Sequence, residues 1–156
     1  MKKLYYLFLL LPFSLLMACS DDKDFSPVDM TLTLDGVTQI DKSFYTVSGE
    51  DVTIEDLQVK SIDGKNTSVA NVTFSLNGVP LVGTPANPFL GTFSTEGLAA
   101  GTYSINVTGN LLQVDQSIKV FAVNYPLTIV SSEENLPDGA PEFGSYSQTI
   151  RISDSK

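Results

Sequence analysis

The sequence predicts an all-β fold of about seven to nine short strands, which follows an N-terminal export signal. After residue 30, apolar residues alternate with polar ones in short runs, the period of a strand with one buried face. Pro and Gly, 8 and 11 in the chain, fall between these runs and mark turns. No stretch after residue 25 keeps the 3.6-residue period of an amphipathic helix.

The first runs predict strands in chain order. The run 30–34 alternates and predicts a strand that ends at the turn signal 35–36. The run 44–47 predicts a second strand. In the run 52–59 the alternation slips by one residue at Asp56, which predicts a β-bulge or two strands that meet at a bend.

A β-hairpin is the strongest local prediction. The alternating strand 72–76 is followed by Asn77-Gly78 and then by a second apolar run. Asn-Gly tolerates the positive φ angles that two-residue hairpin turns require. Further alternating faces occupy 103–107 and 118–122, and two more strands are expected at 127–130 and 147–152.

The segment 97–107, GLAAGTYSINV, resembles the late-strand corner of immunoglobulin-like and fibronectin type III-like domains. In those folds a tyrosine hydroxyl ties the strand to the preceding loop, and the resemblance implies this role for Tyr103. The resemblance covers roughly residues 50–124, and together with the succession of short strands it implies an antiparallel β-sandwich over residues 30–125. The runs at 127–130 and 147–152 make 126–156 a C-terminal extension that is expected to add strands to the same domain. Trp and a second Cys are absent, so the resemblance bears on the fold and not on function.

Residues 1–18 have the three parts of an export signal. Lys2 and Lys3 precede an apolar run, and the small residue Ala18 stands before the predicted cleavage point. The run of about 15 residues is shorter than the roughly 20 that a membrane-spanning helix requires.

The residues Leu16-Met17-Ala18-Cys19 resemble the lipobox of bacterial lipoprotein signal peptides. In that family the cysteine thiol receives a diacylglycerol and the amine is then acylated, so the resemblance implies a lipid anchor on Cys19. Several acyl chains hold a protein firmly, whereas one chain binds only marginally. The alternative is an ordinary signal peptide, whose product is cleaved and released.

The five residues after Cys19 resemble the export signal of surface-exposed lipoproteins in the Bacteroidetes. The resemblance implies that Ser20, Asp21, Asp22 and Asp24 direct the chain to the outer face of the outer membrane. A solvated acidic tether over 19–29, on a protein that faces the periplasm, is the alternative.

The charge of the mature chain restricts its partners. Loss of residues 1–18 removes two lysines and no acid, so the net charge changes from −9 to −11. Such a chain repels phosphate backbones, which excludes nucleic acid as a partner, and the same charge argues against adsorption on anionic lipid through a basic face. The expected partners are the membrane, through the N-terminal lipid, and an envelope protein or a glycan.

The residue types exclude most catalytic chemistry. One cysteine and no histidine exclude an intramolecular disulfide, Cys/His zinc sites and the Ser-His-Asp triad. Neighbouring carboxylates, as at Glu50-Asp51 or Glu133-Glu134, point to opposite faces of a strand and do not converge by themselves. A non-enzymatic protein without a cofactor or a metal is therefore expected, although acidic loops leave calcium open.

Three aromatic residues, Tyr125, Phe143 and Tyr146, are candidates for ligand binding because sugar rings stack on flat aromatic faces. The polar segment 131–144 is either a functional loop or an ordered return segment. The expected function is protein or glycan binding at the envelope, or an accessory role in an outer-membrane assembly. The alternative is a carbohydrate-binding lipoprotein of a polysaccharide-uptake system, and in a small β domain all three aromatic residues can equally belong to the core.

Overall fold

The structure, a computed structural model, describes residues 25–81, 90–114 and 116–153. Strands make up most of these residues, so the predicted all-β fold is confirmed. No helix among them is long and apolar enough to span a bilayer. The elements in chain order are β1 (Val28–Ile40), β2 (Ser43–Val47), β3 (Asp51–Ser61), β4 (Thr67–Leu76), β5 (Val79–Pro80), β6 (Gly91–Ser94), β7 (Gly101–Gln113), β8 (Lys119–Val130), the 3-10 helix η1 (Glu133–Asn135) and β9 (Gly144–Ile152).

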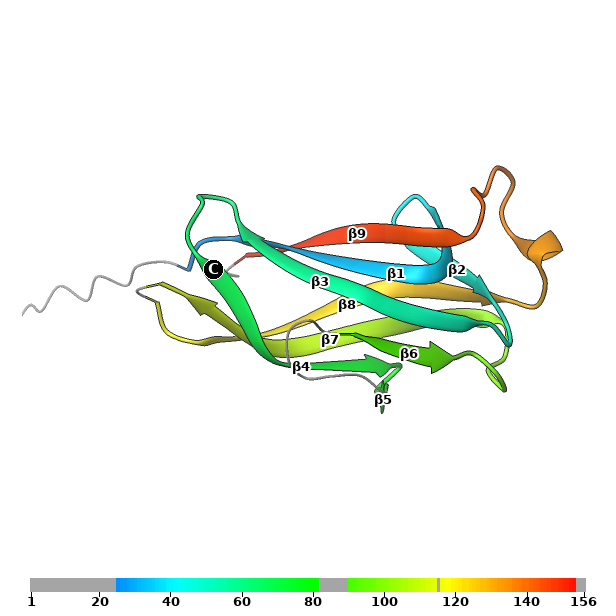
Figure 1. Ribbon diagram of the computed structural model, residues 1–156, viewed down its shortest axis with the longest axis horizontal. Coiled ribbons are helices and arrows are strands. Elements are labelled where there is room, and N and C mark those ends of the chain that lie inside the picture. Colours follow the sequence, from blue (N-terminus) through cyan, green and yellow to red (C-terminus); the bar gives the residue numbers. More distant parts are fainter. Residues whose placement is uncertain (1–24, 82–89, 115, 154–156) are drawn as a thin grey trace, which may run out of the picture.

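The strands form a curled, mixed sheet in the order β5-β4-β7-β8-β2-β1-β3-β6, and β9 also pairs with β1. In Figure 1, β9, β1 and β3 lie above β4, β7 and β8, and the apolar core lies between them. Fully buried side chains come from both sides of the curl, for example Leu32 and Leu34 of β1 and Leu127 of β8. Parallel pairing of β2 with β8 departs from the antiparallel arrangement that the sequence predicts. These strands are far apart in the chain, so no tight turn forces them to be antiparallel.

Strand β1 joins the two parts of the sheet. Its residues 28–35 pair with β3 on one side, and residues 28–34 and 37 pair with β9 on the other, while residues 38–40 pair with β2. The predicted strand end at 35–36 is wrong, because β1 continues to Ile40. Gly36 has φ +80° and lies where the register with β9 shifts, so it bends the strand without ending it.

Two local predictions are confirmed at residue level. Leu76 lies opposite Val79, and Asn77 and Gly78 both have positive φ, 47° and 84°, as a two-residue hairpin turn requires. The phase slip predicted near Asp56 is a bulge: Thr33 of β1 faces Asp56 while Leu34 faces Ile54, which leaves Glu55 as the extra residue.

The hydrogen bond that the resemblance implied for Tyr103 is present. The Tyr103 hydroxyl donates to the Ala99 carbonyl oxygen at 2.8 Å. This bond ties β7 to the loop that precedes it, and so fixes that loop at one end of the domain.

The C-terminal segment continues the same ladders. Strand β8 runs through residues 125 and 126 without interruption, to Val130. Strand β9 pairs with β1 from Val28↔Ile152 to Val37↔Gly144. The chain is already packed before residue 30, since Phe25 and Ser26 are buried.

Candidate functional site

The long strands give the domain two opposite ends. At the entry end, where the described chain begins, the Ile62 N–H donates to the Pro27 carbonyl (3.0 Å) and the Val114 N–H to that of Asn66 (3.3 Å). We define the entry end as residues 25–29, 60–66, 112–114, 116–120 and 151–153. The far end comprises residues 48–50, 95–100 and 131–143; Figure 1 shows the segment 131–143 at the opposite side from the turn between β3 and β4.

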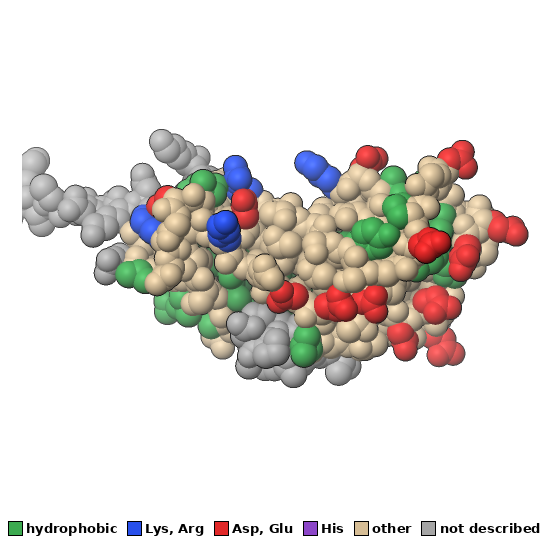
Figure 2. Space-filling model, turned by 45° about the horizontal axis from the view of Figure 1, so that its top comes forward, with side chains coloured by type: hydrophobic (Ala, Val, Ile, Leu, Met, Phe, Trp, Pro, Cys, Tyr) green, Lys and Arg blue, Asp and Glu red, His purple; other side chains and the backbone are tan. Residues whose placement is uncertain are grey.

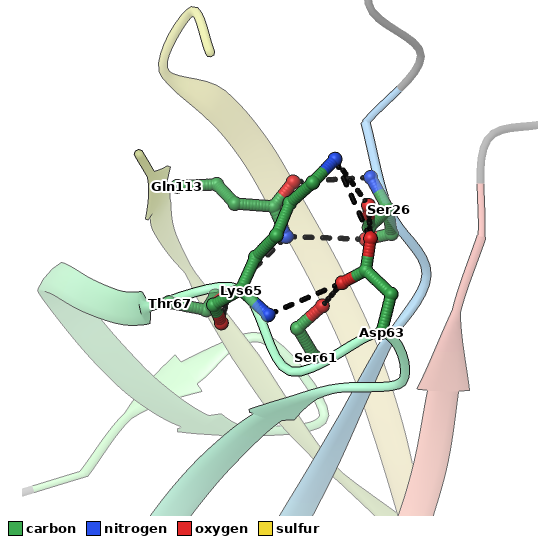
Figure 3. A network of polar contacts seen from close by, with 6 residues as sticks. All are labelled: Ser26, Ser61, Asp63, Lys65, Thr67 and Gln113. Atoms are coloured by element: carbon green, nitrogen blue, oxygen red, sulfur yellow. Dashed lines mark hydrogen bonds and ion pairs between the residues drawn. The ribbon is translucent and has the colours of Figure 1, made fainter. Parts of the chain in front are cut away.

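A buried glutamine fixes the chain at the entry end (Figure 3). Gln113 Oε1 accepts a hydrogen bond from the Ser26 N–H at 3.0 Å. Its Nε2 donates to Thr67 Oγ1 at 3.1 Å and to the Ser26 carbonyl at 3.4 Å. Buried polar groups of this kind need partners, so Gln113 determines where the N-terminal segment joins the fold.

Asp63 completes the network on the other side of Ser26. It accepts hydrogen bonds from the Ser26 hydroxyl at 2.5 Å, from the Ser61 hydroxyl and from the Lys65 N–H at 3.2 Å. The bonds from Ser26 and then Ser61 are the main reason why the pKa of Asp63 lies far below its usual range. Because the folded-state pKa is below the unfolded one, the stability from this network is present above about pH 4 and declines as the pH falls further.

Replacement of Gln113 by leucine is expected to lower the free energy of unfolding by about 1–3 kcal/mol, because the buried Ser26 N–H loses its acceptor. Urea denaturation followed by circular dichroism measures the change. Gln116→Leu, on the partly exposed turn that follows, is the control and should cost less than about 0.5 kcal/mol. Equal effects of the two variants would contradict the role assigned to Gln113.

At the far end, a hollow of about 280 Å³ is lined by residues from separate parts of the chain. Phe143 supplies an aromatic face and is half-buried. Carboxylates reach the same hollow from the β2–β3 turn, from the start of β3 and from η1. The lining residues are Gly36, Val47, Glu50, Asp51, Glu133 and Phe143.

The hollow is suited to hydrogen-bond donors and to cationic groups. Its carboxylates accept hydrogen bonds, and its one aromatic ring offers a stacking surface. Within the described ranges, no group of three Cys, His, Asp or Glu side chains is placed to hold a metal ion.

Sequence reasoning missed the convergence at this hollow. Glu50 and Asp51 are exposed, as expected of surface charges, but they were not expected to converge, because neighbours in a strand face opposite ways. Glu50, however, lies just before β3 begins at Asp51, so strand alternation does not separate the two. Glu133 joins them through tertiary contact, for which the sequence carries no signal.

Tyr125 is fully buried, so its side chain is not available to a ligand at the surface. Its hydroxyl donates to the Met30 carbonyl oxygen at 2.8 Å, and burial raises its pKa. Tyr125 alternates with Val123 and Leu127 on the inner face of β8. That period-two pattern was the sequence signal for a core position.

Tyr146 holds the loop on which Phe143 lies. Its hydroxyl donates to the Glu142 carbonyl at 2.7 Å, and its half-buried ring packs against the core. The buried Thr38 hydroxyl donates to the Pro141 carbonyl at 2.8 Å. Both bonds fix the backbone just before Phe143, so Tyr146 positions this residue. Of the three predicted aromatic residues, Phe143 is the one that lines the hollow.

The lipidation residue Cys19 and the export-signal residues Ser20, Asp21, Asp22 and Asp24 lie outside the described residues. Fold and hollow together define an all-β domain with an acidic surface depression at the end opposite Phe25, the first described residue. No protein-family model matches the chain, and no curated protein matches it.

Proposed function

We propose that this protein is a non-enzymatic lipoprotein of the outer membrane, anchored through Cys19 and exposed on the cell surface, and that its far end binds a partner. The observation that carries the proposal is that the chain enters the domain at one end and the hollow lies at the other. The chain enters the fold at Phe25, six residues after Cys19, and the hollow with Phe143 lies at the opposite end. β7 has 13 residues, so the two ends are about 40 Å apart at about 3.3 Å per residue.

We further propose that the sheet is an immunoglobulin-like sandwich. Two sets of ladders support this: β9, β1, β3 and β6 pair in one set, and β2, β8, β7, β4 and β5 pair in the other. β1 links the sets through its hairpin with β2. The tyrosine corner at Tyr103 is a further feature of that fold. A rigid scaffold of this kind presents end loops to a partner.

The charge of the far end favours a protein partner with a basic surface, such as a component of an envelope assembly. Acidic side chains gather there, as Figure 2 shows at the end away from the described N-terminus. Attraction between surfaces of opposite charge raises the association rate of two proteins, and repulsion between like charges disfavours other partners. The acidic residues of this end and its nearby turns are Asp35, Asp41, Glu50, Asp51, Glu96, Glu133, Glu134, Asp138 and Glu142.

A specific observation also favours the alternative, a carbohydrate-binding lipoprotein of a polysaccharide-uptake system. Phe143 offers an aromatic face inside a hollow whose carboxylates can accept hydrogen bonds from sugar hydroxyls. The two functions differ in their salt dependence, because attraction between charged surfaces is screened at high ionic strength whereas stacking on a ring is not.

Phe143→Ala is expected to weaken partner binding by about tenfold or more, since an aromatic anchor in a pocket carries much of the binding energy. The full mature chain is tested by envelope pull-down and by affinity gels with a glycan panel, each at low and high salt. Val79→Ala removes an exposed apolar side chain outside the far end and should leave binding unchanged.

Salt-sensitive capture of one envelope protein, lost with Phe143→Ala, supports the protein-binding function. Salt-insensitive retardation by one glycan, lost with the same variant, supports the alternative. Partner binding that survives Phe143→Ala would contradict the far-end hollow as the binding site.

A further inference from the structure

Four of the six exposed large apolar side chains in the described parts of the chain lie at the entry end. Ile62, Val114, Ile118 and Val120 have relative exposures of 51%, 55%, 64% and 76%. They lie on the β3–β4 turn, the β7–β8 turn and the first residues of β8. We call these four residues the entry patch. Clusters of exposed apolar side chains mark contact with a partner or a membrane.

The chain connects this end to the lipidation site by a very short segment. Only Ser20 to Asp24 separate Cys19 from Phe25, which is buried and therefore belongs to the fold. The six Cα–Cα steps from Cys19 to Phe25 span at most about 22 Å when fully extended. A lipid on Cys19 therefore holds the entry end next to the bilayer, at an effective concentration at which weak contacts suffice.

The charges at the entry end are compatible with a lipid surface, although the net charge of the chain is not. Arg151 pairs with Asp29 (2.8 Å) and Lys65 with Asp63 (3.4 Å), and the two acids are thereby balanced. Lys60 adds positive charge at the end of β3, and Lys119 Nζ lies 5.0 Å from the centre of the Phe25 ring. Figure 2 shows most of the visible basic side chains at this end and most of the acidic ones at the other. Nine of the 13 acidic residues in the described parts of the chain lie at the far end and its nearby turns, while the short segment 20–24 adds three acids and one lysine beside the anchor.

We infer that the entry patch docks on the bilayer that carries the anchor, with its apolar side chains in the headgroup region and the far end directed away from the membrane. This inference rests on the proposed lipid anchor. Apolar contact plus attraction to anionic headgroups is the usual basis of such interfacial binding. The occupant is the membrane itself, and docking fixes the orientation in which the hollow is presented.

The test uses the mature acylated chain in vesicles of phosphatidylcholine and phosphatidylglycerol. An environment-sensitive fluorophore is attached at Ser117→Cys, beside the entry patch, or at Asp138→Cys, at the far end; both positions are exposed. Lipids with a nitroxide near the headgroup quench a fluorophore that contacts the surface. We expect quenching at position 117 to exceed that at 138 by about fivefold, and the double variant Ile118→Ser/Val120→Ser to remove most of it. Val79→Ser, an equally exposed apolar residue elsewhere (67%), is the matched control and should change nothing.

Equal quenching at the two positions, or quenching at 117 that the double variant leaves intact, would overturn the inference. A disulfide that forms under a mild oxidant between two unlabelled Ser117→Cys chains in the vesicles, but not between two unlabelled Asp138→Cys chains, would overturn it too, because a second copy would then cover the patch. The intact mass of the same sample shows whether the docking inference alone has failed or whether the proposed lipid anchor has failed as well. Absence of acyl groups on Cys19 removes the anchor and with it both proposals, whereas acylation without quenching removes docking alone.

Discussion

Replacement of Tyr125 by alanine is expected to destabilise the domain by about 4 kcal/mol, the largest effect of any single change considered. Large-to-small changes of buried aromatic residues typically cost 3–5 kcal/mol, because transfer energy is lost and a cavity remains. Tyr125 is fully buried and also donates a hydrogen bond to the Met30 carbonyl. It thereby joins β8 to β1 across the core.

Chemical denaturation measures this loss, and two variants separate its causes. Tyr125→Phe keeps the ring and removes the hydroxyl, and should cost about 1 kcal/mol. Tyr45→Ala, at a half-buried position on β2, should cost clearly less than Tyr125→Ala. If Tyr125→Ala abolished partner binding but left stability unchanged, Tyr125 would be a ligand-binding residue and its placement in the core would be contradicted.

Replacement of Gly36 by alanine is expected to destabilise the domain by about 3 kcal/mol. A Cβ at this position would lie 2.4 Å from the Asp51 carbonyl oxygen, and φ is +80°. Steric strain and unfavourable backbone geometry each cost on the order of 1–3 kcal/mol. Since β1 bends at Gly36 to pair first with β3 and β9 and then with β2, relief of the clash would disturb both parts of the sheet.

Gly139→Ala is the matched control for Gly36→Ala. Gly139 has nearly the same φ, +81°, but nothing lies within 4 Å of the added Cβ. It should therefore cost only the backbone strain, about 1 kcal/mol. Similar losses for the two variants in thermal unfolding would show that the contact with Asp51 does not constrain β1.

The sequence was most informative where structure is local. Alternation placed most strands, Asn77-Gly78 placed the hairpin, and the slip at Asp56 marked the bulge, because each depends on a few neighbouring residues. The predicted end of β1 at 35–36 was wrong because the continuation of this strand depends on distant residues. Gly36 has the same local signature in a turn as in a bend within a strand, and only pairing with β2 and β9 distinguishes them.

The candidate site was less accessible from sequence. Phe143 was identified from its loop, but Glu50, Asp51 and Glu133 join it through tertiary packing that no local pattern encodes. Tyr125 was grouped with Phe143 because it lies near a segment end, although its alternation with buried neighbours indicated the core. The separation of charge between the two ends also depends on the topology, since the net charge of −9 carries no information on position.

The most direct test of the account is the intact mass of the protein extracted from the outer membrane of cells that express the full chain. The proposed anchor predicts a chain that begins at Cys19 and carries a diacylglycerol on the thiol and an acyl group on the amine. A chain that begins at another residue, or that begins at Cys19 with a free thiol, would contradict the lipid anchor on which both the far-end function and the membrane orientation depend.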